Sequence, residues 1–338
     1  MERILIVNLN WRGDVLFSTP FIRALREAYP ESFLATLLVR RCAPIVENSP
    51  HLDEVIIFDE DKNHKGLMGK LRLIRLLRAK HFDTVFLLHR SFTRTLICWL
   101  SGIPERIGYY TKKRARLLTK SIMPSKDEPH RIEYFLDIAR SCGIKAENSG
   151  YDFFVSREDK DYIKELLHEE KLLKESDFLV VINPGGNWDL KRWPKENFSQ
   201  LADRLIKECD AKVIITGAQD DLKLAQDIKA GMKNSPLILC GRTSLGQLAA
   251  LMARVNLVIS NDSGPMHIAL SQKANVVCLF GPTSSKITGP CGNGNYTVLQ
   301  KDIGCQVPCY ELNCPDNRCM KAIGVDEVFQ AVEKIKNG

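Results

Sequence analysis

The chain has 338 residues, of which 44% are hydrophobic and 26% are charged, and it carries 48 Lys and Arg against 41 Asp and Glu. This length is typical of two domains with separate hydrophobic cores, and the composition excludes a globally disordered, collagen-like or coiled-coil chain. The formal net charge is +7, and its excess is confined to the first half. Residues 1–150 hold 25 basic and 17 acidic residues, whereas residues 151–338 hold 23 and 24.

Apolar runs of strand length alternate with helical patterns along the first half. The predicted strands are Ile4–Asn8, Leu34–Val39, Val55–Phe58 and Val85–His89. The first helix is predicted over Phe21–Tyr29, with Thr19 as its N-cap and Pro20 at its first position. A second helix is predicted over Gly66–Lys80.

The second predicted helix belongs to a strongly basic region. Lys62–Lys120 contains 15 basic residues and only two acidic ones, Asp83 and Glu105. Such a region can face nucleic acid, an anionic membrane or an anionic substrate, or it can be plain solvated surface. The chain lacks the usual nucleic-acid-binding modules, so we expect no nucleic-acid partner. Within the helix, an apolar stripe is expected to pack on a sheet; its members are Leu67, Leu71, Ile74 and Leu77.

The second half repeats the alternation of strands and helices. Strands are predicted at Phe178–Asn183, Lys212–Gly217, Leu237–Cys240, Leu257–Ser260 and Asn275–Phe280, and helices at Asn197–Cys209, Gly246–Ala253 and Asp326–Lys336. Continuous apolar strands with intervening helices indicate buried parallel sheets, hence an α/β fold with two doubly wound domains. We expect domains at 1–155 and 156–322, joined by an acidic connection near Ser156–Ser176, and a closing helix at 323–338.

The N-terminal segment and the cysteines indicate in which compartment the protein works and whether it can hold a metal. Met1–Val7 is typical of a first strand rather than a signal peptide, and no apolar run approaches the roughly 18 residues of a spanning helix. We therefore expect a cytoplasmic protein. Four of the 11 cysteines form a C-x3-C-x4-C-x4-C cluster, which fits either reduced loop thiols or a structural zinc site; these are Cys305, Cys309, Cys314 and Cys319.

The loop after the first strand, Asn10–Val15, argues against a nicotinamide dinucleotide. It contains the single glycine Gly13, where that cofactor would require G-x-G-x-x-G. Asp14 then stands at the start of a helix. It can cap that helix, or it can act as a general base facing a crevice.

Two loops of the second half have the residues of an anion site. In Pro184–Pro194, backbone N–H groups at Gly185 and Gly186 can cradle a phosphate, and Lys191 and Arg192 can neutralise it. The Trp193-Pro194 pair is expected to start the next helix.

Asn261–His267 forms a strand-to-helix corner whose free N–H groups can receive a diphosphate. Asp262 is better suited to sugar hydroxyls, because two anions repel each other. His267 lies near enough to donate to phosphate. A further carboxylate, Asp221 or its neighbour Asp220, can hold ribose hydroxyls.

Three regions together resemble the signatures of glycosyltransferase family 9, the ADP-heptose:lipopolysaccharide heptosyltransferases. They are Asn10–Pro20, Pro184–Pro194, and Ser260–His267 followed by Leu279-Phe280-Gly281-Pro282-Thr283. Lys191–Pro194, Asn261–Gly264 and Ser101–Gly108 are most similar to the heptosyltransferase II branch. The resemblance implies a GT-B fold, in which two Rossmann-like domains face each other across a cleft. It also implies inverting heptose transfer to the lipopolysaccharide core without a metal; the charged segment Asp59-Glu60-Asp61 matches a D-x-D motif only in letters.

The resemblance also implies roles for individual residues. Asp14 would be the general base, and Lys191 would stabilise the departing diphosphate. The nucleotide sugar would be held by Gly185, Gly186, Asn187, Arg192, Asp221, Asp262, Ser263, Gly264 and His267. The acceptor would be held by Arg12, Gly13, Arg106, Lys112, Lys113, Arg114 and Arg116.

The implied donor is ADP-heptose, with no further cofactor. The implied acceptor is an anionic glycolipid, a Kdo-lipid A core carrying heptose, reached by peripheral contact with the cytoplasmic face of the inner membrane. Two alternatives stay open: a GT-B enzyme with another nucleotide sugar or acceptor, and a non-catalytic nucleotide-sugar or glycan-binding protein.

Overall fold

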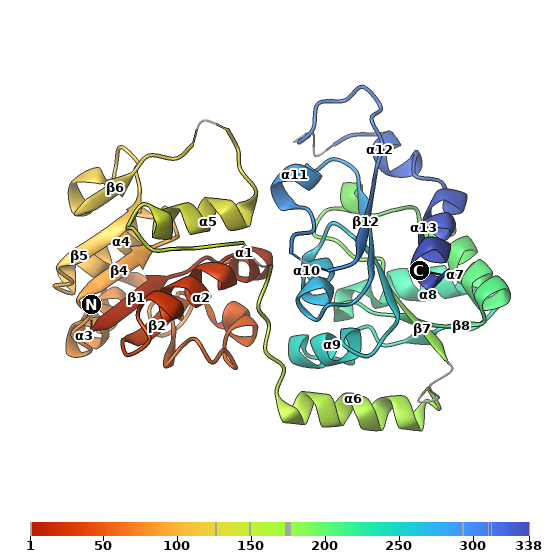
Figure 1. Ribbon diagram of the computed structural model, residues 1–338, viewed down its shortest axis with the longest axis horizontal. Coiled ribbons are helices and arrows are strands. Elements are labelled where there is room, and N and C mark those ends of the chain that lie inside the picture. Colours follow the sequence, from red (N-terminus) through yellow and green to blue (C-terminus); the bar gives the residue numbers. More distant parts are fainter. Residues whose placement is uncertain are drawn as a thin grey trace. The chain divides into compact units, whose positions relative to one another are not determined.

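The computed structural model describes residues 2–125, 127–148, 150–172, 177–292, 294–309, 311 and 313–337. The chain divides into two units, Met1–Phe154 and Val155–Gly338. Each unit contains one six-stranded sheet with helices on both faces (Figure 1). In the described part of the chain, no helix is both long and apolar enough to cross a bilayer.

The first unit has a parallel sheet in the order β3-β2-β1-β4-β5-β6. Its strands are β1 (Arg3–Val7), β2 (Phe33–Leu38), β3 (Glu54–Ile57), β4 (Thr84–Leu87), β5 (Glu105–Tyr109) and β6 (Lys120–Ile122). The central strand β1 pairs with both β2 and β4, and its residues from Ile4 to Val7 are fully buried. Burial on both faces explains why this strand is an uninterrupted apolar run.

Helices cover both faces of the first sheet. They are α1 (Arg12–Phe17), α2 (Thr19–Ala28), α3 (Gly66–Ala79), α4 (Phe92–Leu100) and α5 (Arg131–Arg140). Leu5 and Val7 of β1 share a core with residues of α3 and α4, and α2 packs against α5. The cap expected at Thr19 is wrong. Ser18 is the residue between α1 and α2, and the Thr19 hydroxyl instead donates to the carbonyl of Leu16.

The second unit repeats the topology of the first, in the order β12-β11-β10-β7-β8-β9, again all parallel. Its strands are β7 (Phe178–Asn183), β8 (Ala211–Ile215), β9 (Leu237–Ile238), β10 (Leu257–Asn261), β11 (Val276–Phe280) and β12 (Tyr296–Gln300). The prediction of two doubly wound α/β domains is confirmed. The nine expected strands are all present with ends shifted by at most two residues, whereas β5, β6 and β12 were not predicted.

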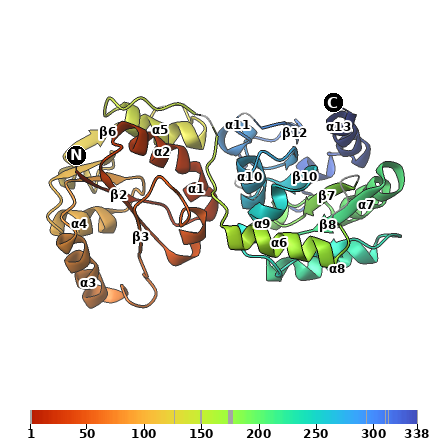
Figure 2. The ribbon, with the colours of Figure 1, turned by 60° about the horizontal axis from the view of Figure 1, so that its bottom comes forward.

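The helices of the second unit include four that the sequence analysis did not predict. The unit contains α6 (Arg157–Glu169), α7 (Lys195–Cys209), α8 (Leu222–Ala230), α9 (Leu245–Met252), α10 (Gly264–Ser271), α11 (Ser285–Thr288), α12 (Arg318–Lys321) and α13 (Val325–Asn337), of which α6, α8, α11 and α12 were not predicted. The acidic connection expected at Ser156–Ser176 is mostly the helix α6, capped by the Ser156 hydroxyl and packed on α9 (Figure 2). Residues 173–176 of that prediction lie outside the described residues.

The strand order determines where ligands can be bound in each unit. Connections leave the central strands β1 and β7 toward one edge of their sheet, and those of β4 and β10 lead toward the other edge. The loops after such a pair of strands diverge and leave a crevice at the carboxyl ends. The candidate residues after β1, β7 and β10 all stand at these two switch points.

Candidate active site

The loop after β7 is held to β10 by one buried amide. The side-chain nitrogen of Asn261 donates to the carbonyls of Pro184 (2.8 Å) and Gly185 (3.2 Å), while its oxygen accepts from the backbone N–H of Trp193 (3.2 Å). Asn261 is fully buried at the end of β10. It therefore ties both ends of the loop to the neighbouring strand, a positioning role that the sequence analysis did not assign.

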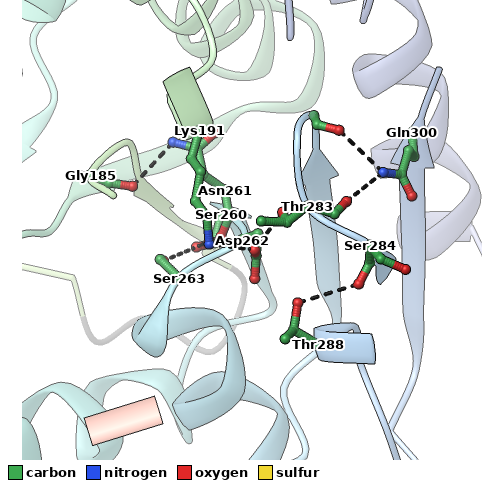
Figure 3. Close-up of polar contacts among 11 residues, drawn as sticks. Gly185, Lys191, Ser260, Asn261, Asp262, Ser263, Thr283, Ser284, Thr288 and Gln300 are labelled. Carbon is green, nitrogen blue, oxygen red and sulfur yellow. Dashed lines mark hydrogen bonds and ion pairs between the residues drawn. The ribbon is translucent and has the colours of Figure 1, made fainter. Parts of the chain in front are cut away.

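Lys191 and Asp262 form an ion pair at this switch point (Figure 3). The Nζ of Lys191 lies 2.7 Å from Oδ2 of Asp262, and the same oxygen accepts from the hydroxyl of Thr283 at 2.6 Å. The carboxylate is only 5% exposed and the lysine 18%. The structure thus brings together the residues expected to hold the sugar and the diphosphate, and it adds Thr283 to them.

The loop that carries Thr283 is positioned from the edge of the sheet. Gln300, at the end of β12, donates from its side-chain nitrogen to the carbonyls of Thr283 (2.7 Å) and Gly281 (3.3 Å) (Figure 3). β12 lies outside the predicted elements, so nothing in the sequence analysis connected Gln300 with this loop.

The expected ribose ligand, Asp221, lies against the glycine loop. A Cβ on Gly185 would stand 2.8 Å from Oδ2 of Asp221, so any larger residue here would force this carboxylate to shift. The carboxylate accepts from the backbone N–H of Ala218 at 2.9 Å. Arg192 donates to the carbonyl of Gly186 (3.0 Å) and lies 3.7 Å from Asp221. The two glycines, Arg192 and Asp221 therefore form one cluster.

The strand-to-helix corner is open at Gly264 and buried at His267. Ser263 precedes the first turn of α10, and its hydroxyl lies 3.2 Å from that of Ser260. A Cβ on Gly264 would meet nothing within 4 Å. His267 is 3% exposed in the same turn, and Asn187 is exposed in the loop after β7.

In the first unit, Asp14 lies in the first turn of α1, directly after β1. Partial burial raises the pKa of its carboxyl above the ordinary value, and the positive charge of Arg131 opposes that rise. A carboxylate with a raised pKa is the better proton acceptor, which suits the predicted general base. The alternative capping role is not seen, since the residue before α1 is Trp11 and no side chain caps that helix.

Buried Arg94 braces the loop that carries Asp14. It donates to the carbonyl of Asn8 (2.8 Å) and to the side chain of Asn10, and it is 4% exposed. Two further arginines join this loop to the segment around Arg41. Arg12 donates to the carbonyl of Arg41, and Arg41 donates to the carbonyl of Asn10. Arg94 and Arg41 are basic residues that the sequence analysis did not single out.

Two residues expected to bind the acceptor, Arg106 and Arg114, donate hydrogen bonds to backbone carbonyls. Arg114 is fully buried, and its guanidinium donates to the carbonyls of His89 and Tyr109; burial lowers its pKa to about 10. Arg106 donates to the carbonyls of Ile103, Pro104 and Leu117. The guanidinium of Arg114 is not available to an acceptor, so its assignment is corrected. Arg106 is half-buried, and its assignment remains a prediction.

Four further expected acceptor cations are exposed, namely Arg12, Lys112, Lys113 and Arg116. Gly13 lies in α1 with open space at its Cβ position. Their assignment to the acceptor remains a prediction.

The four clustered cysteines line one cavity of about 530 Å3 in the second unit. All four are free thiols. Across the described residues, no group of three or more His, Cys, Asp or Glu side chains is arranged to hold a metal ion. The geometry therefore gives the zinc alternative at Cys305, Cys309, Cys314 and Cys319 no support.

The comparisons with known proteins identify the family of the chain. The family model "Glycosyltransferase family 9 (heptosyltransferase)" matches residues 70–318. Lipopolysaccharide heptosyltransferase 2 of Salmonella typhimurium is 29% identical over 308 residues, covering 85% of either chain. Lipopolysaccharide heptosyltransferase 3 of Escherichia coli is 28% identical over 348 residues, covering 97% of this chain and 96% of the other.

Solved structures show the same fold. A family 9 glycosyl transferase from Veillonella parvula superposes with a TM-score of 0.92 at 28% identity, covering 99% of this chain and 97% of that one. The E. coli ADP-heptose lipopolysaccharide heptosyltransferase II superposes with a TM-score of 0.81 at 24% identity, covering 99% and 98%. The predicted GT-B class is thereby confirmed. The chain is a glycosyltransferase and belongs to glycosyltransferase family 9.

Proposed function

We propose that this enzyme transfers heptose from ADP-heptose to the inner core of lipopolysaccharide, as a heptosyltransferase of type II. The observation that carries the proposal is the pair of Lys191 with buried Asp262, beside the Gly185–Gly186 loop. The curated relatives named above, a heptosyltransferase 2 and a heptosyltransferase 3, support the choice of sugar.

In the proposed reaction, Asp14 takes the proton from an acceptor hydroxyl. The hydroxyl oxygen attacks the anomeric carbon of heptose from the face opposite the diphosphate, and the bond from that carbon to the diphosphate oxygen breaks. The configuration therefore inverts, and ADP leaves with the bonding electrons. Negative charge grows on the diphosphate as the bond breaks, so a nearby cation stabilises the transition state more than the ground state.

Lys191 and Arg192 are the proposed cations for this charge, with no further cofactor required. Lys191 is paired with Asp262. A bound diphosphate would compete for the ammonium group, and Asp262 would then be free to accept from heptose hydroxyls. Thr283, which shares Asp262 Oδ2, would keep the carboxylate oriented during this exchange.

The proposed acceptor is an anionic glycolipid, a Kdo-lipid A core that already carries heptose. The exposed cations Lys112, Lys113 and Arg116 of the first unit would face its phosphates and carboxylates. Such an acceptor places the enzyme at the cytoplasmic face of the inner membrane, by peripheral contact.

A transfer assay tests the proposal. Purified enzyme is supplied with ADP-heptose or with UDP-sugars, and with a deacylated core acceptor that contains Kdo, with or without heptose. We expect turnover with ADP-heptose and the heptose-containing acceptor, giving a product with inverted anomeric configuration by NMR. Turnover with a UDP-sugar alone would replace the donor assignment, and hydrolysis or binding without transfer would contradict the reaction.

A further inference from the structure

One face of α3 exposes apolar side chains that the sequence pattern placed in the core. Leu67, Met68 and Leu71 are 75%, 65% and 37% exposed. The helix is instead buried through Leu73, Ile74 and Leu77. At 100° per residue, these buried residues lie on the opposite side of the helix from Met68. The exposed apolar residues are therefore left outside the core of the first unit.

Arginines share this exposed face. Positions 67, 71, 75 and 78 fall within about 80° of arc on a helix, so Arg75 and Arg78 continue the line that Leu67 and Leu71 begin. Arg72 is also exposed. α3 contains no acidic residue. Its solvent side therefore begins with the apolar Leu67, Met68 and Leu71, and the three arginines follow, with exposed Leu76 among them.

The end of α4 extends the same surface. α3 and α4 pack against each other, and Arg78 donates to the carbonyl of Leu100 at 2.7 Å. Trp99 and Leu100 are 48% and 39% exposed. Figures 1 and 2 show both helices on the first unit. We refer to this surface as the α3–α4 face; it consists of Leu67, Met68, Leu71, Arg72, Arg75, Leu76, Arg78, Trp99 and Leu100.

Acidic residues near this face are engaged elsewhere or stand at its margin. Glu60 lies 3.8 Å from buried Arg94. The Asp59 carboxylate accepts from the backbone N–H of Asn63, within its own turn. Asp61 is exposed in that turn, ahead of the helix. The α3–α4 face itself carries three arginines and no carboxylate.

We propose that the α3–α4 face docks this enzyme on the surface of an anionic lipid bilayer, an inference that rests on the membrane contact of the proposed function and gives it a surface. Its leucines, Met68 and Trp99 enter the boundary between headgroups and acyl chains, and its arginines bind lipid phosphates. A second copy of the chain fits less well, because a symmetric contact would bring arginines against arginines. A polynucleotide would satisfy the arginines but leave exposed leucines without an apolar partner.

Vesicle co-sedimentation of the full chain tests this inference without any transfer reaction. The probes are vesicles of phosphatidylethanolamine with phosphatidylglycerol, and vesicles of phosphatidylcholine alone. We expect binding to the anionic vesicles that weakens with added salt, and little binding to phosphatidylcholine. Because transfer is not measured, failure of the proposed heptosyltransferase activity would leave this result intact.

Two triple variants separate the contributions of charge and apolar contact. Arg72→Gln, Arg75→Gln and Arg78→Gln together should weaken binding about a hundredfold, at roughly fivefold per arginine. Leu67→Gln, Met68→Gln and Leu71→Gln together should weaken it at least tenfold even at low salt. The circular dichroism spectrum and the thermal unfolding midpoint of the full chain should be unchanged in both variants, which serves as the control for folding of the first unit.

The matched control removes the same number of positive charges, three, from another exposed helix, α6. Arg157→Gln, Lys160→Gln and Lys164→Gln on α6 should leave vesicle binding unchanged. An equal loss in this control, or no loss in either α3 variant, would overturn the inference. So would concentration-dependent dimerisation of the wild type that the apolar variant abolishes, since that outcome assigns the face to a second copy of the chain.

Discussion

Single residues at the two switch points have environments that differ from those of ordinary surface groups. Asp14 is partly buried beside the charge of Arg131. Asp262 is nearly inaccessible, yet it is satisfied by Lys191 and Thr283. Burial strengthens electrostatic interactions because the surrounding dielectric is low. Removing one partner of the Lys191–Asp262 pair should therefore lower stability as well as change the chemistry of the site.

Protonation of Asp14 should cause the acid limb of the pH–rate profile, which is the fall in activity at low pH. A general base must be unprotonated, and the folded protein holds the pKa of Asp14 above its ordinary value of 3.8. Activity should therefore fall as the pH drops through this raised pKa, and it should be full above it. Asp14→Asn should lower kcat by about 10²- to 10⁴-fold and remove this limb.

The measurement is kcat/KM for the acceptor against pH, with ADP affinity followed by calorimetry in the same variant. ADP binding should persist, because Asp14 belongs to the first unit and the nucleotide residues to the second. A normal rate in Asp14→Asn, or an unchanged acid limb, would contradict the assignment.

Lys191 and Asp262 should have opposite effects on diphosphate binding. Lys191→Ala removes the cation and should weaken ADP binding roughly ten- to hundredfold, as expected for a charge-assisted hydrogen bond. Asp262→Asn frees the ammonium group from its 2.7 Å ion pair, so ADP should bind as well or better. Sugar transfer should nevertheless fall in the second variant.

Calorimetric titration with ADP and a transfer assay distinguish the two effects. Equal loss of ADP affinity in both variants would show that the ion pair acts only as a structural brace. That result would remove Lys191 from the leaving-group role.

At the scale of elements, the loop after β7 depends on a close approach of backbone to side chain. Gly185→Ala would place a Cβ 2.8 Å from Oδ2 of Asp221, which is itself held by the Ala218 N–H. The clash should lower the free energy of unfolding by about 1–3 kcal/mol. Gly264→Ala is the matched control, because its Cβ would meet nothing within 4 Å and alanine favours a helix.

Denaturant titration and ADP calorimetry check both variants. Gly264→Ala should keep its stability but lose ADP affinity, since the open space beside Gly264 is where the phosphate is expected. If Gly264→Ala bound ADP normally, Gly264 would not belong to the binding site.

At the scale of the whole molecule, two sheets of the same strand order have separate cores. Leu5 belongs to a core in the first unit and Ile182 to one in the second. Leu5→Ala and Ile182→Ala should each lower the stability of their own unit by about 2–5 kcal/mol. Hydrogen exchange should accelerate in the strands of the altered unit only, and acceleration in both units would show that they unfold together.

Much of the fold, and the placing of candidate residues at the ends of β7 and β10, followed from local pattern. Strands buried on both faces, such as β1 and β7, are unbroken apolar runs, so their positions and parallel pairing could be predicted. The glycines and cations that follow β7 could be recognised because parallel sheets bind ligands at the carboxyl ends of their strands. β6 has three residues, two of them exposed, and offered no such pattern.

Tertiary structure alone decided which charged and apolar side chains face solvent. Arg114 looked like an acceptor ligand in a basic run, yet its guanidinium is buried on the carbonyls of His89 and Tyr109. Leu67 and Leu71 continued an apolar stripe, yet they lie outside the core. The local sequence determines which residues follow a strand. Burial and hydrogen-bond partners, by contrast, depend on segments distant in the chain that only packing brings together.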